Sequence, residues 1–149
     1  MGKSIIIKGA DFSEVALASV NLFDPSLVRR NYAVYAPSDS GAATVKTYDG
    51  FCTTPYIPIP EGAKKIHIVS PVIKSGSVRY RFTTAASDSE AVPQGTGLAG
   101  LYGGPSTTEA TLNVPTDSNY IYFCASIYRG TKAEASTIDL SGVTIEALF

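Results

Sequence analysis

Short segments rich in Val, Ile, Thr, Tyr and Phe recur along the whole chain, and clusters of Gly, Pro, Asp and Ser separate them. β-Branched and aromatic residues favour strands, whereas the separating residues favour turns. The pattern therefore predicts an all-β protein. The expected strands cover residues 4–8, 32–36, 44–52, 56–59, 64–70, 77–84, 108–114, 119–128 and 137–148.

Signals for helix are few. Asp24 is a capping residue with Pro25 in the following position, which predicts a single turn that reaches Arg30. Residues 13–18 are expected to form another turn. Neither segment is long enough to be a stable helix without tertiary packing, so helices have a minor part in the expected fold.

Apolar and polar side chains alternate along the expected strands. Tyr80 and Phe82, for example, alternate with Arg79 and Arg81. This alternation is typical of antiparallel sheets that pack face to face as a β-sandwich. In the last strand the apolar positions change parity across residues 141–142, which predicts a β-bulge. The residues expected in the core between the sheets are Val78, Tyr80, Phe82, Ile121, Phe123, Ile127, Ile138, Leu140, Val143 and Ile145.

The length of 149 residues fits one domain that can bury a core without disulfide bonds. We expect residues 1–20 to form an N-terminal strand and arm, and residues 21–149 to form the sandwich. The Gly-, Ala- and Ser-rich segment 84–107 is expected to be a long loop. Residues 95–100 match GxGxxG, but they lack the flanking strand and helix that a dinucleotide site requires.

Charge and hydropathy exclude several classes of partner. The chain carries 12 basic and 13 acidic residues, a balance that argues against nucleic acid and anionic lipid. No segment reaches the ~18 consecutive apolar residues of a membrane helix, so no membrane insertion is expected. Lys8 interrupts the first apolar run too early for a signal peptide. We expect either an intracellular protein or a component of a larger assembly.

Residues suited to catalysis or metal binding are scarce. His67 is the single histidine, which excludes sites that need two. It is expected on the polar face of a strand, and the sequence places no nucleophile or carboxylate beside it. Cys52 and Cys124 fall in expected strands and are predicted to be buried free thiols, without a disulfide bond between them. We therefore expect no enzyme, no metal and no cofactor.

One expected sheet face is a candidate binding surface. Tyrosines alternate along 119–128 on the side away from the core, and two arginines point outward from a second strand. Aromatic rings stack on sugar rings and guanidinium groups bond pairs of hydroxyls, so this Tyr/Arg face suits a glycan. It equally suits a protein interface, where Tyr and Arg are enriched, or packing beneath the N-terminal segment. The candidate ligand-binding residues are Arg79, Arg81, Tyr120, Tyr122 and Tyr128.

Several short phrases resemble those of known proteins. Residues 3–13, Lys-Ser-Ile-Ile-Ile-Lys-Gly-Ala-Asp-Phe-Ser, are similar to an opening found in small proteins of gut bacteria and in tail or fibre proteins of their phages. The phrases at 21–24, 56–62 and 114–121 resemble parts of jelly-roll β-sandwich modules in the same proteins. The resemblance implies a jelly-roll fold like that of carbohydrate-binding modules. It also implies a non-catalytic structural or adhesive role in a phage tail, fibre or surface assembly. The alternative is a carbohydrate-binding module that uses the Tyr/Arg face.

The start of the chain bears on self-association. Ile5, Ile6 and Ile7 form a continuous apolar run, which fits a strand covered on both faces. Such a strand either closes an edge of its own sandwich or adds to a sheet edge of a neighbouring subunit. The expected partners are therefore copies of this chain or other assembly proteins, with glycans as a further class. The sequence does not assign a compartment.

Overall fold

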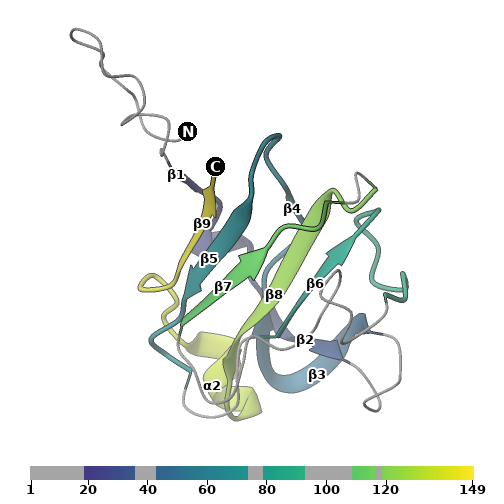
Figure 1. Cartoon of the computed structure of the whole chain (residues 1–149). Helices are drawn as coiled ribbons and strands as arrows, with labels where there is room; N and C mark the ends of the chain where they lie inside the picture. The colour runs from purple at the N-terminus through teal and green to yellow at the C-terminus, as the bar shows by residue number, and fades with distance from the viewer. Residues whose placement is uncertain (1–18, 36–42, 74–78, 93–108, 117–118) are drawn as a thin grey trace, which may run out of the picture.

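The chain folds into two antiparallel sheets that pack face to face, as expected for an all-β sandwich (Figure 1). This computed structural model describes residues 19–35, 43–73, 79–92, 109–116 and 119–149. Its elements are β1 (Ser19–Asn21), the 3₁₀-helix η1 (Pro25–Leu27), β2 (Arg29–Tyr35), β3 (Thr44–Thr53), β4 (Ile57–Pro58), β5 (Lys65–Val69), β6 (Arg79–Thr83), β7 (Glu109–Asn113), β8 (Tyr122–Arg129), α2 (Lys132–Thr137) and β9 (Thr144–Leu148).

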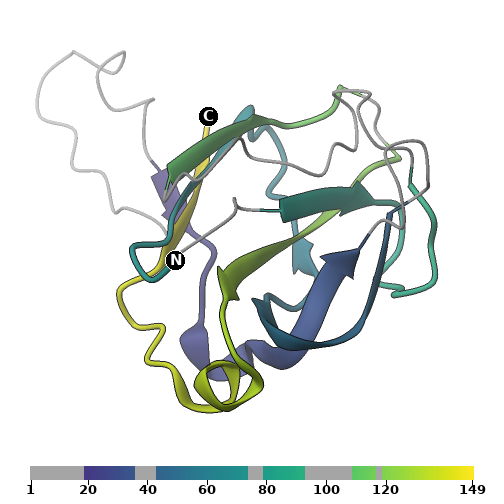
Figure 2. The same ribbon diagram turned by 90° about the horizontal axis from the view of Figure 1, so that it is seen from below.

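The two sheets appear as separate layers when the molecule is viewed from below (Figure 2). The first sheet has the strand order β1-β9-β5-β7. In the second sheet β2 pairs with β3, and β8 lies at the centre. β3 and β4 pair with consecutive parts of one edge of β8, while β6 pairs with the other edge. After β1 the chain enters the second sheet, and from β4 to β9 every strand lies in the sheet opposite its predecessor.

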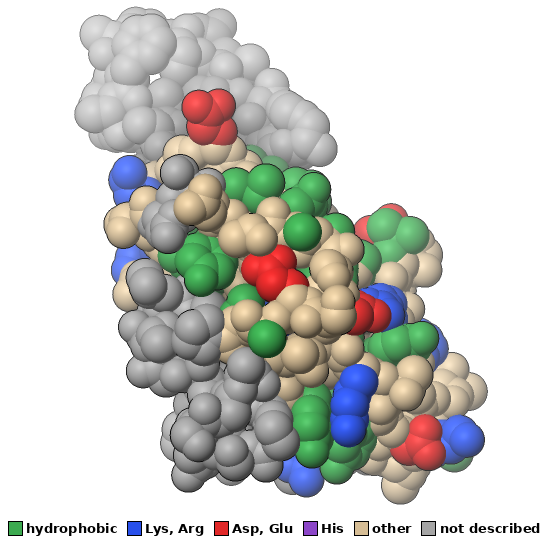
Figure 3. Space-filling view, turned by 90° about the vertical axis from the view of Figure 1, so that its right-hand side faces the viewer, with side chains coloured by type: hydrophobic (Ala, Val, Ile, Leu, Met, Phe, Trp, Pro, Cys, Tyr) green, Lys and Arg blue, Asp and Glu red, His purple; other side chains and the backbone are tan. Residues whose placement is uncertain are grey.

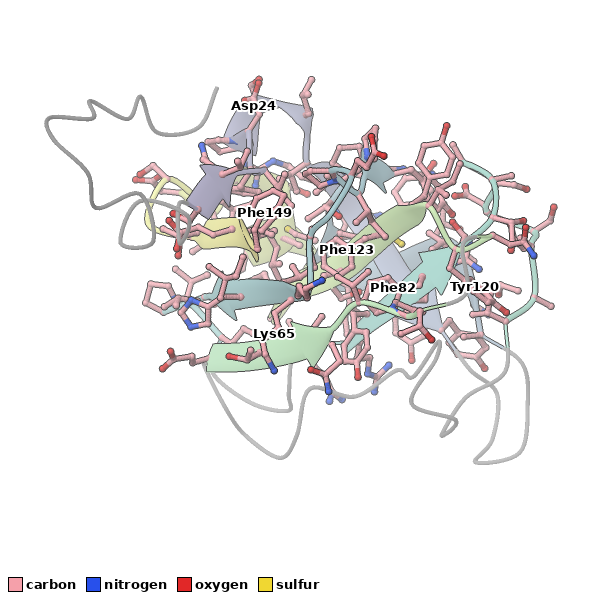
Figure 4. All side chains as sticks on the ribbon, turned by 45° about the horizontal axis from the view of Figure 1, so that its top comes forward. Asp24, Lys65, Phe82, Tyr120, Phe123 and Phe149 are labelled. Carbon is pink, nitrogen blue, oxygen red and sulfur yellow. The ribbon has the colours of Figure 1, made fainter. Side chains whose placement is uncertain are left out.

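The main core lies between the sheets, where the alternation predicted it. Phe82 on β6 and Phe123 on β8 meet there with ring centroids 5.6 Å apart (Figure 4). Ile66 and Ile68 on β5 face them from the first sheet, with Ile145 on β9. The expected core residues confirmed as buried are Phe82, Phe123, Ile127, Leu140, Val143 and Ile145.

The other expected core residues differ from the prediction. Ile121 is 50% exposed, because it precedes β8 at the end of the sandwich, where its N–H bonds to Thr83 O and its carbonyl accepts from Ile59 N. Tyr80 and Ile138 are only partly buried. Val78 lies outside the described residues, as do the strand expected at 4–8, the turn at 13–18 and the GxGxxG match. Of the expected arm, only Ser19 and Val20 are described, and they lie in β1.

The final strand expected at 137–148 is shorter: the helix α2 ends at Thr137, a turn follows at 141–142, and only Thr144–Leu148 form a strand. Thr131 and Glu134 form a capping box: Glu134 N donates to Thr131 Oγ1 at 3.1 Å, and Thr131 N donates to Glu134 Oε1 at 3.0 Å. This cap starts α2, which buries Ala135. Ser141 N then donates to Asp139 Oδ1, so residues 141–142 form a turn and not the expected β-bulge. By contrast, the turn expected after Asp24 is present as η1, where Asp24 Oδ1 accepts from Ser26 N, but it ends at Leu27 and not at Arg30, which lies in β2.

β3 bends strongly where it meets the loop after β8 (Figure 1). Gly50 has a φ of 96°, in the region that favours glycine, and Gly130 N donates to its carbonyl at 2.7 Å. A Cβ atom at Gly50 would lie 2.1 Å from Gly130 O, so no other residue fits there. The bend directs the first half of β3, together with β2, over the outer face of the second sheet. Within the described ranges, no helix has the length and apolar composition needed to cross a membrane.

Two neighbouring substitutions test the position of the core. Phe123→Ala is expected to lower the free energy of unfolding by about 3–5 kcal/mol, because it leaves a cavity between the sheets. Ile121→Ala is expected to cost less than about 0.5 kcal/mol, since half of that side chain already faces solvent. Urea unfolding of both variants measures the difference, and equal losses would contradict this assignment of the core.

Candidate functional site

The Tyr/Arg face predicted from sequence exists as a set of neighbours. β6 pairs with β8 so that Arg81 lies opposite Cys124 and Thr83 lies opposite Tyr122. Because side chains opposite each other point to the same face of a sheet, the arginines of β6 and Tyr122 of β8 share the face away from the main core. An irregularity in the pairing of β3 with β8, between Ser126 and Tyr128, changes the parity of β8, and Tyr128 packs in the main core with Cys52 and Ala135, so its expected place on the outer face is wrong. The pairing that the sequence could only assume is therefore present.

That face is covered, however, so the expectation that it is exposed is wrong. Arg81 has no exposed surface, and Cys124 opposite it is 1% exposed. The bent β3 and its partner β2 bring a second set of apolar side chains onto this face. We call this set the outer core, and it consists of Val34, Ala43, Val45, Val92 and Cys124. Tyr128, which packs in the main core, is 1% exposed, and its hydroxyl donates to Glu134 Oε1 of α2 at 3.0 Å.

Arg81 is the polar centre of the outer core. Its Nη1 donates to the carbonyl of Ala43 at 3.2 Å and to the carbonyl of Glu90, and its Nη2 donates to Ser87 O at 2.6 Å and Tyr56 Oη at 2.6 Å. A buried guanidinium that lost these acceptors would incur a large desolvation cost. Among the described residues, Arg81 Nε is the single buried side-chain N or O atom without a hydrogen-bond partner.

Asp88 links this buried charge to the surface. It accepts from Arg29 Nη1 and Nη2 at 2.7 and 2.8 Å, and from the hydroxyl of Tyr56 at 2.9 Å. The bidentate Arg29 contact holds the pKa of Asp88 below its ordinary value, while burial raises the pKa of the Tyr56 hydroxyl. We call Arg29, Tyr56, Arg81 and Asp88 the Arg81 network. It anchors the segment after β6 over the sheet, so these residues stabilise the fold.

The remaining predicted site residues are in three different places. Arg79 is partly buried, with its guanidinium carbon 5.4 Å from the centre of the Phe51 ring. Tyr122 is partly buried at the start of β8, where it pairs with Pro58 of β4 on one side and with Thr83 of β6 on the other. Tyr120 lies before β8 and lines a surface groove. The structure therefore does not bring the five predicted residues into one open site.

His67 has a carboxylate partner but no catalytic surroundings. Its Nε2 and Glu109 Oε2 are 2.6 Å apart on the outer face of the first sheet, where β5 pairs with β7. Among the described residues, the His67 side chain forms this one hydrogen bond. Within the same residues, no group of three or more His, Cys, Asp or Glu side chains is placed to hold a metal. Cys52 and Cys124 are free buried thiols, and burial raises the pKa of Cys124 to about 11.

An open groove lies at the end of the sandwich, between the β4–β5 turn and the segment that joins β7 to β8. It consists of two adjoining hollows of about 530 and 350 Å³ that share Gly62, Ala63, Val114 and Pro115. We call it the end groove. The two hollows are lined by Ile59, Pro60, Glu61, Gly62, Ala63, Lys64, Lys65, Asn113, Val114, Pro115, Thr116, Tyr120 and Ile121.

Backbone hydrogen bonds fix the walls of the end groove. Val114 N donates to Lys64 O at 3.0 Å, and Lys64 N donates to Leu148 O at 2.7 Å. On the other side, Ile59 N donates to Ile121 O at 2.9 Å. Gly62 allows the turn between these walls, since its φ of 84° is in the left-handed region. Because both walls are tied to the sheets, the groove is preformed.

The end groove has an apolar lining and a polar rim. Ile121 is half exposed in it, and Phe149, close to Gly62, is 37% exposed. Lys65 Nζ donates to Asn113 Oδ1 at 3.0 Å on the rim. Lys65 and Tyr120 mark opposite ends of the groove (Figure 4). Sequence reasoning proposed only Tyr120 here, although two of the phrases that resemble jelly-roll modules, 56–62 and 114–121, supply most of the lining.

Comparison with known proteins gives one loose structural match. No protein-family model matches the chain, and no curated protein matches it. Among solved structures, the cleaved K3 adhesin domain of Lys-gingipain from Porphyromonas gingivalis W83 is similar over 87% of this chain and 96% of its own, with 10% identity and a TM-score of 0.32. A likeness at this level carries no argument about function.

The role of Arg81 can be tested against that of Arg79, two residues earlier on the same strand. Arg81→Met is expected to lower the free energy of unfolding by about 3–5 kcal/mol, because it leaves the buried acceptors unpaired. Arg79→Met is expected to cost less than about 1 kcal/mol, the scale of an exposed cation–π contact. Thermal and urea unfolding of both variants provide the comparison. Similar losses would show that Arg81 is not the centre of the network.

The Arg29–Asp88 contact predicts how stability depends on pH. The folded pKa of Asp88 lies below its ordinary value of 3.8, so its stabilising effect is present above that value and disappears as pH falls through the folded pKa. Asp88→Asn is expected to lower stability at neutral pH and to make the acid decline shallower, so that the two curves converge in acid. Urea titrations across this range, with Asp49→Asn as an exposed control, check this. An unchanged acid slope in Asp88→Asn would contradict it.

Proposed function

We propose that the chain is a non-catalytic adhesive or structural module of a phage tail, fibre or other surface assembly, and that copies of it associate through the end groove. The observation that carries this proposal is the half-exposed Ile121 in a preformed groove whose lining is largely apolar. Exposed apolar surface with a polar rim is characteristic of protein contact sites. The assignment to a tail or surface assembly is supported by the phrases at 3–13, 56–62 and 114–121.

The absence of a catalytic role is supported by what surrounds the titratable groups. His67 and Glu109 lie on a sheet face and do not line the end groove, and the charged groups in the groove lining are Glu61, Lys64 and Lys65. Catalysis by nucleophile and base needs both within hydrogen-bond reach at a site for substrate. The described residues do not place these groups together, so binding accounts better for the groove.

A jelly-roll topology is part of the same proposal. Its support is the way the chain passes from one sheet to the other between β4 and β9, together with the first sheet's order of β1-β9-β5-β7. In this order β9 lies between β1 and β5, so strands distant in sequence are neighbours, as in Greek-key and jelly-roll sandwiches. Such an arrangement closes both layers around the main core and leaves the connecting segments at the two ends.

For the carbohydrate-binding alternative, the structure leaves fewer of the predicted residues able to contact a glycan. Arg81 and Tyr128 are buried and cannot contact a glycan on the Tyr/Arg face. Of the predicted residues, Arg79, Tyr120 and Tyr122 retain exposed surface. Tyr120 lies in one hollow of the end groove and the Lys65–Asn113 pair lies in the other, so an aromatic ring and polar groups are at opposite ends of a groove that a chain of sugars could span. A glycan bound in this groove would compete with the proposed association between copies of the chain.

A pair of matched substitutions tests association through the end groove. Ile121 and Leu27 are both exposed large apolar residues, at 50% and 58%, but Leu27 lies on η1, away from the groove. Ile121→Asp is expected to abolish association because it places a charge in the apolar contact, whereas Leu27→Asp is expected to retain it. Sedimentation equilibrium over a range of concentrations measures the mass. A monomer at every concentration, or equal behaviour of the two variants, would overturn the proposal.

A further inference from the structure

A row of aromatic and basic side chains crosses the outer side of the β2–β3 pair. The Tyr35 and Tyr48 rings lie with centroids 5.9 Å apart, and Tyr48 meets Phe51 edge-on at 5.0 Å. Lys46 Nζ lies 3.9 Å from the centre of the Tyr35 ring, and the guanidinium carbon of Arg129 lies 5.5 Å from the centre of the Phe51 ring. We call these five residues, Tyr35, Lys46, Tyr48, Phe51 and Arg129, the β3 strip.

The inner part of the strip is fixed and its outer part is open. Phe51 is buried beneath Arg129, whereas Tyr48 is 43% exposed and Lys46 and Arg129 are exposed. Figure 3 shows Lys and Arg side chains lying directly against hydrophobic surface on this side of the molecule. Among the described residues, neither Lys46 nor Arg129 has a carboxylate within ion-pair distance, since the two ion pairs there join Arg29 to Asp88 and His67 to Glu109.

A hollow of about 350 Å³ lies beside the exposed ring of Tyr48. It is lined by Lys46, Thr47, Tyr48 and Asp49, so it combines a cation, a hydroxyl, an aromatic ring and a carboxylate. The carboxylate accepts hydrogen bonds from hydroxyl groups, and the cations attract negative charge. A ligand that fits this set therefore carries hydroxyl donors, anionic groups and a face that stacks on an aromatic ring.

We propose that the β3 strip binds an acidic polysaccharide, a chain of sugars that carry carboxylate groups. The sugar rings stack on Tyr48, the guanidinium of Arg129 and the ammonium of Lys46 pair with the carboxylates, and Asp49 accepts from sugar hydroxyls. Single-stranded DNA also uses aromatic and basic groups, but its deoxyribose–phosphate backbone has no hydroxyl along the chain to donate to Asp49, whereas every sugar of a polysaccharide carries hydroxyls. This inference extends the adhesive role proposed above to a second surface, away from the end groove.

Binding of oligogalacturonate, measured by isothermal titration calorimetry at low salt, tests the proposal. We expect binding that weakens as salt screens the charges, and about tenfold weaker binding in Tyr48→Ala and in Lys46→Gln. Asp49→Asn replaces a charged hydroxyl acceptor with a weaker neutral one, so it is expected to bind the fully methyl-esterified oligomer less well. Lys132→Gln on α2 is the matched charge control and is expected to bind like wild type. Circular dichroism confirms that each variant is folded.

Three outcomes would overturn the proposal: no binding of oligogalacturonate, equal binding of its fully methyl-esterified form, or tighter binding of oligothymidylate. The first two exclude recognition of sugar carboxylates, and the third assigns the strip to nucleic acid. The titrations use protein concentrations at which sedimentation shows a single species. Failure of saccharide binding then refutes this inference alone, while failure to associate refutes only the role of the end groove.

Discussion

The arrangement of the second sheet depends on one buried cation. Arg81 lies in an apolar interior, where a guanidinium is tolerated only if acceptors surround it. Most of those acceptors are backbone carbonyls, of Ala43, Ser87 and Glu90, so satisfying the charge fixes the path of the chain itself. The segment after β6 and the start of β3 are thereby held over β8. An apolar residue in place of Arg81 could fill the volume but could not specify those paths.

A consequence is that β8 is buried on both faces. Phe123, Ile127 and Tyr128 pack in the main core, and Cys124 and Ser126 face the outer side, yet all of them have at most 3% exposure. A central strand of this kind is unusual in an antiparallel sandwich, where one face normally meets solvent. The polar groups on its outer side are satisfied within the protein. The Ser126 hydroxyl, for example, accepts from Val34 N.

These features show how far the sequence could predict the structure. Alternation gave the correct faces for Phe82 and Phe123, because the period of a strand fixes the parity of its side chains. It could not show that Arg81 is covered, since cover comes from the bend of β3 at Gly50, a tertiary effect. The capping box at Thr131 and Glu134 was readable from sequence, but the apolar residues after it suggested a strand. The end groove joins segments far apart in the chain, and only Tyr120 was assigned to binding beforehand.

The pairing of β1 with β9 makes the two ends of the sandwich different from each other. Ser19 lies opposite Leu148, and Leu148 O accepts from Lys64 N in the wall of the end groove, so the first described residue, the last strand and the groove share one end of the sandwich. The bend of β3 lies at the other end (Figure 1). A tether attached at either side of this β1–β9 pair would hold the groove near its neighbours in an assembly. The same attachment would project the aromatic and basic surface of β3 outward, into the surrounding medium.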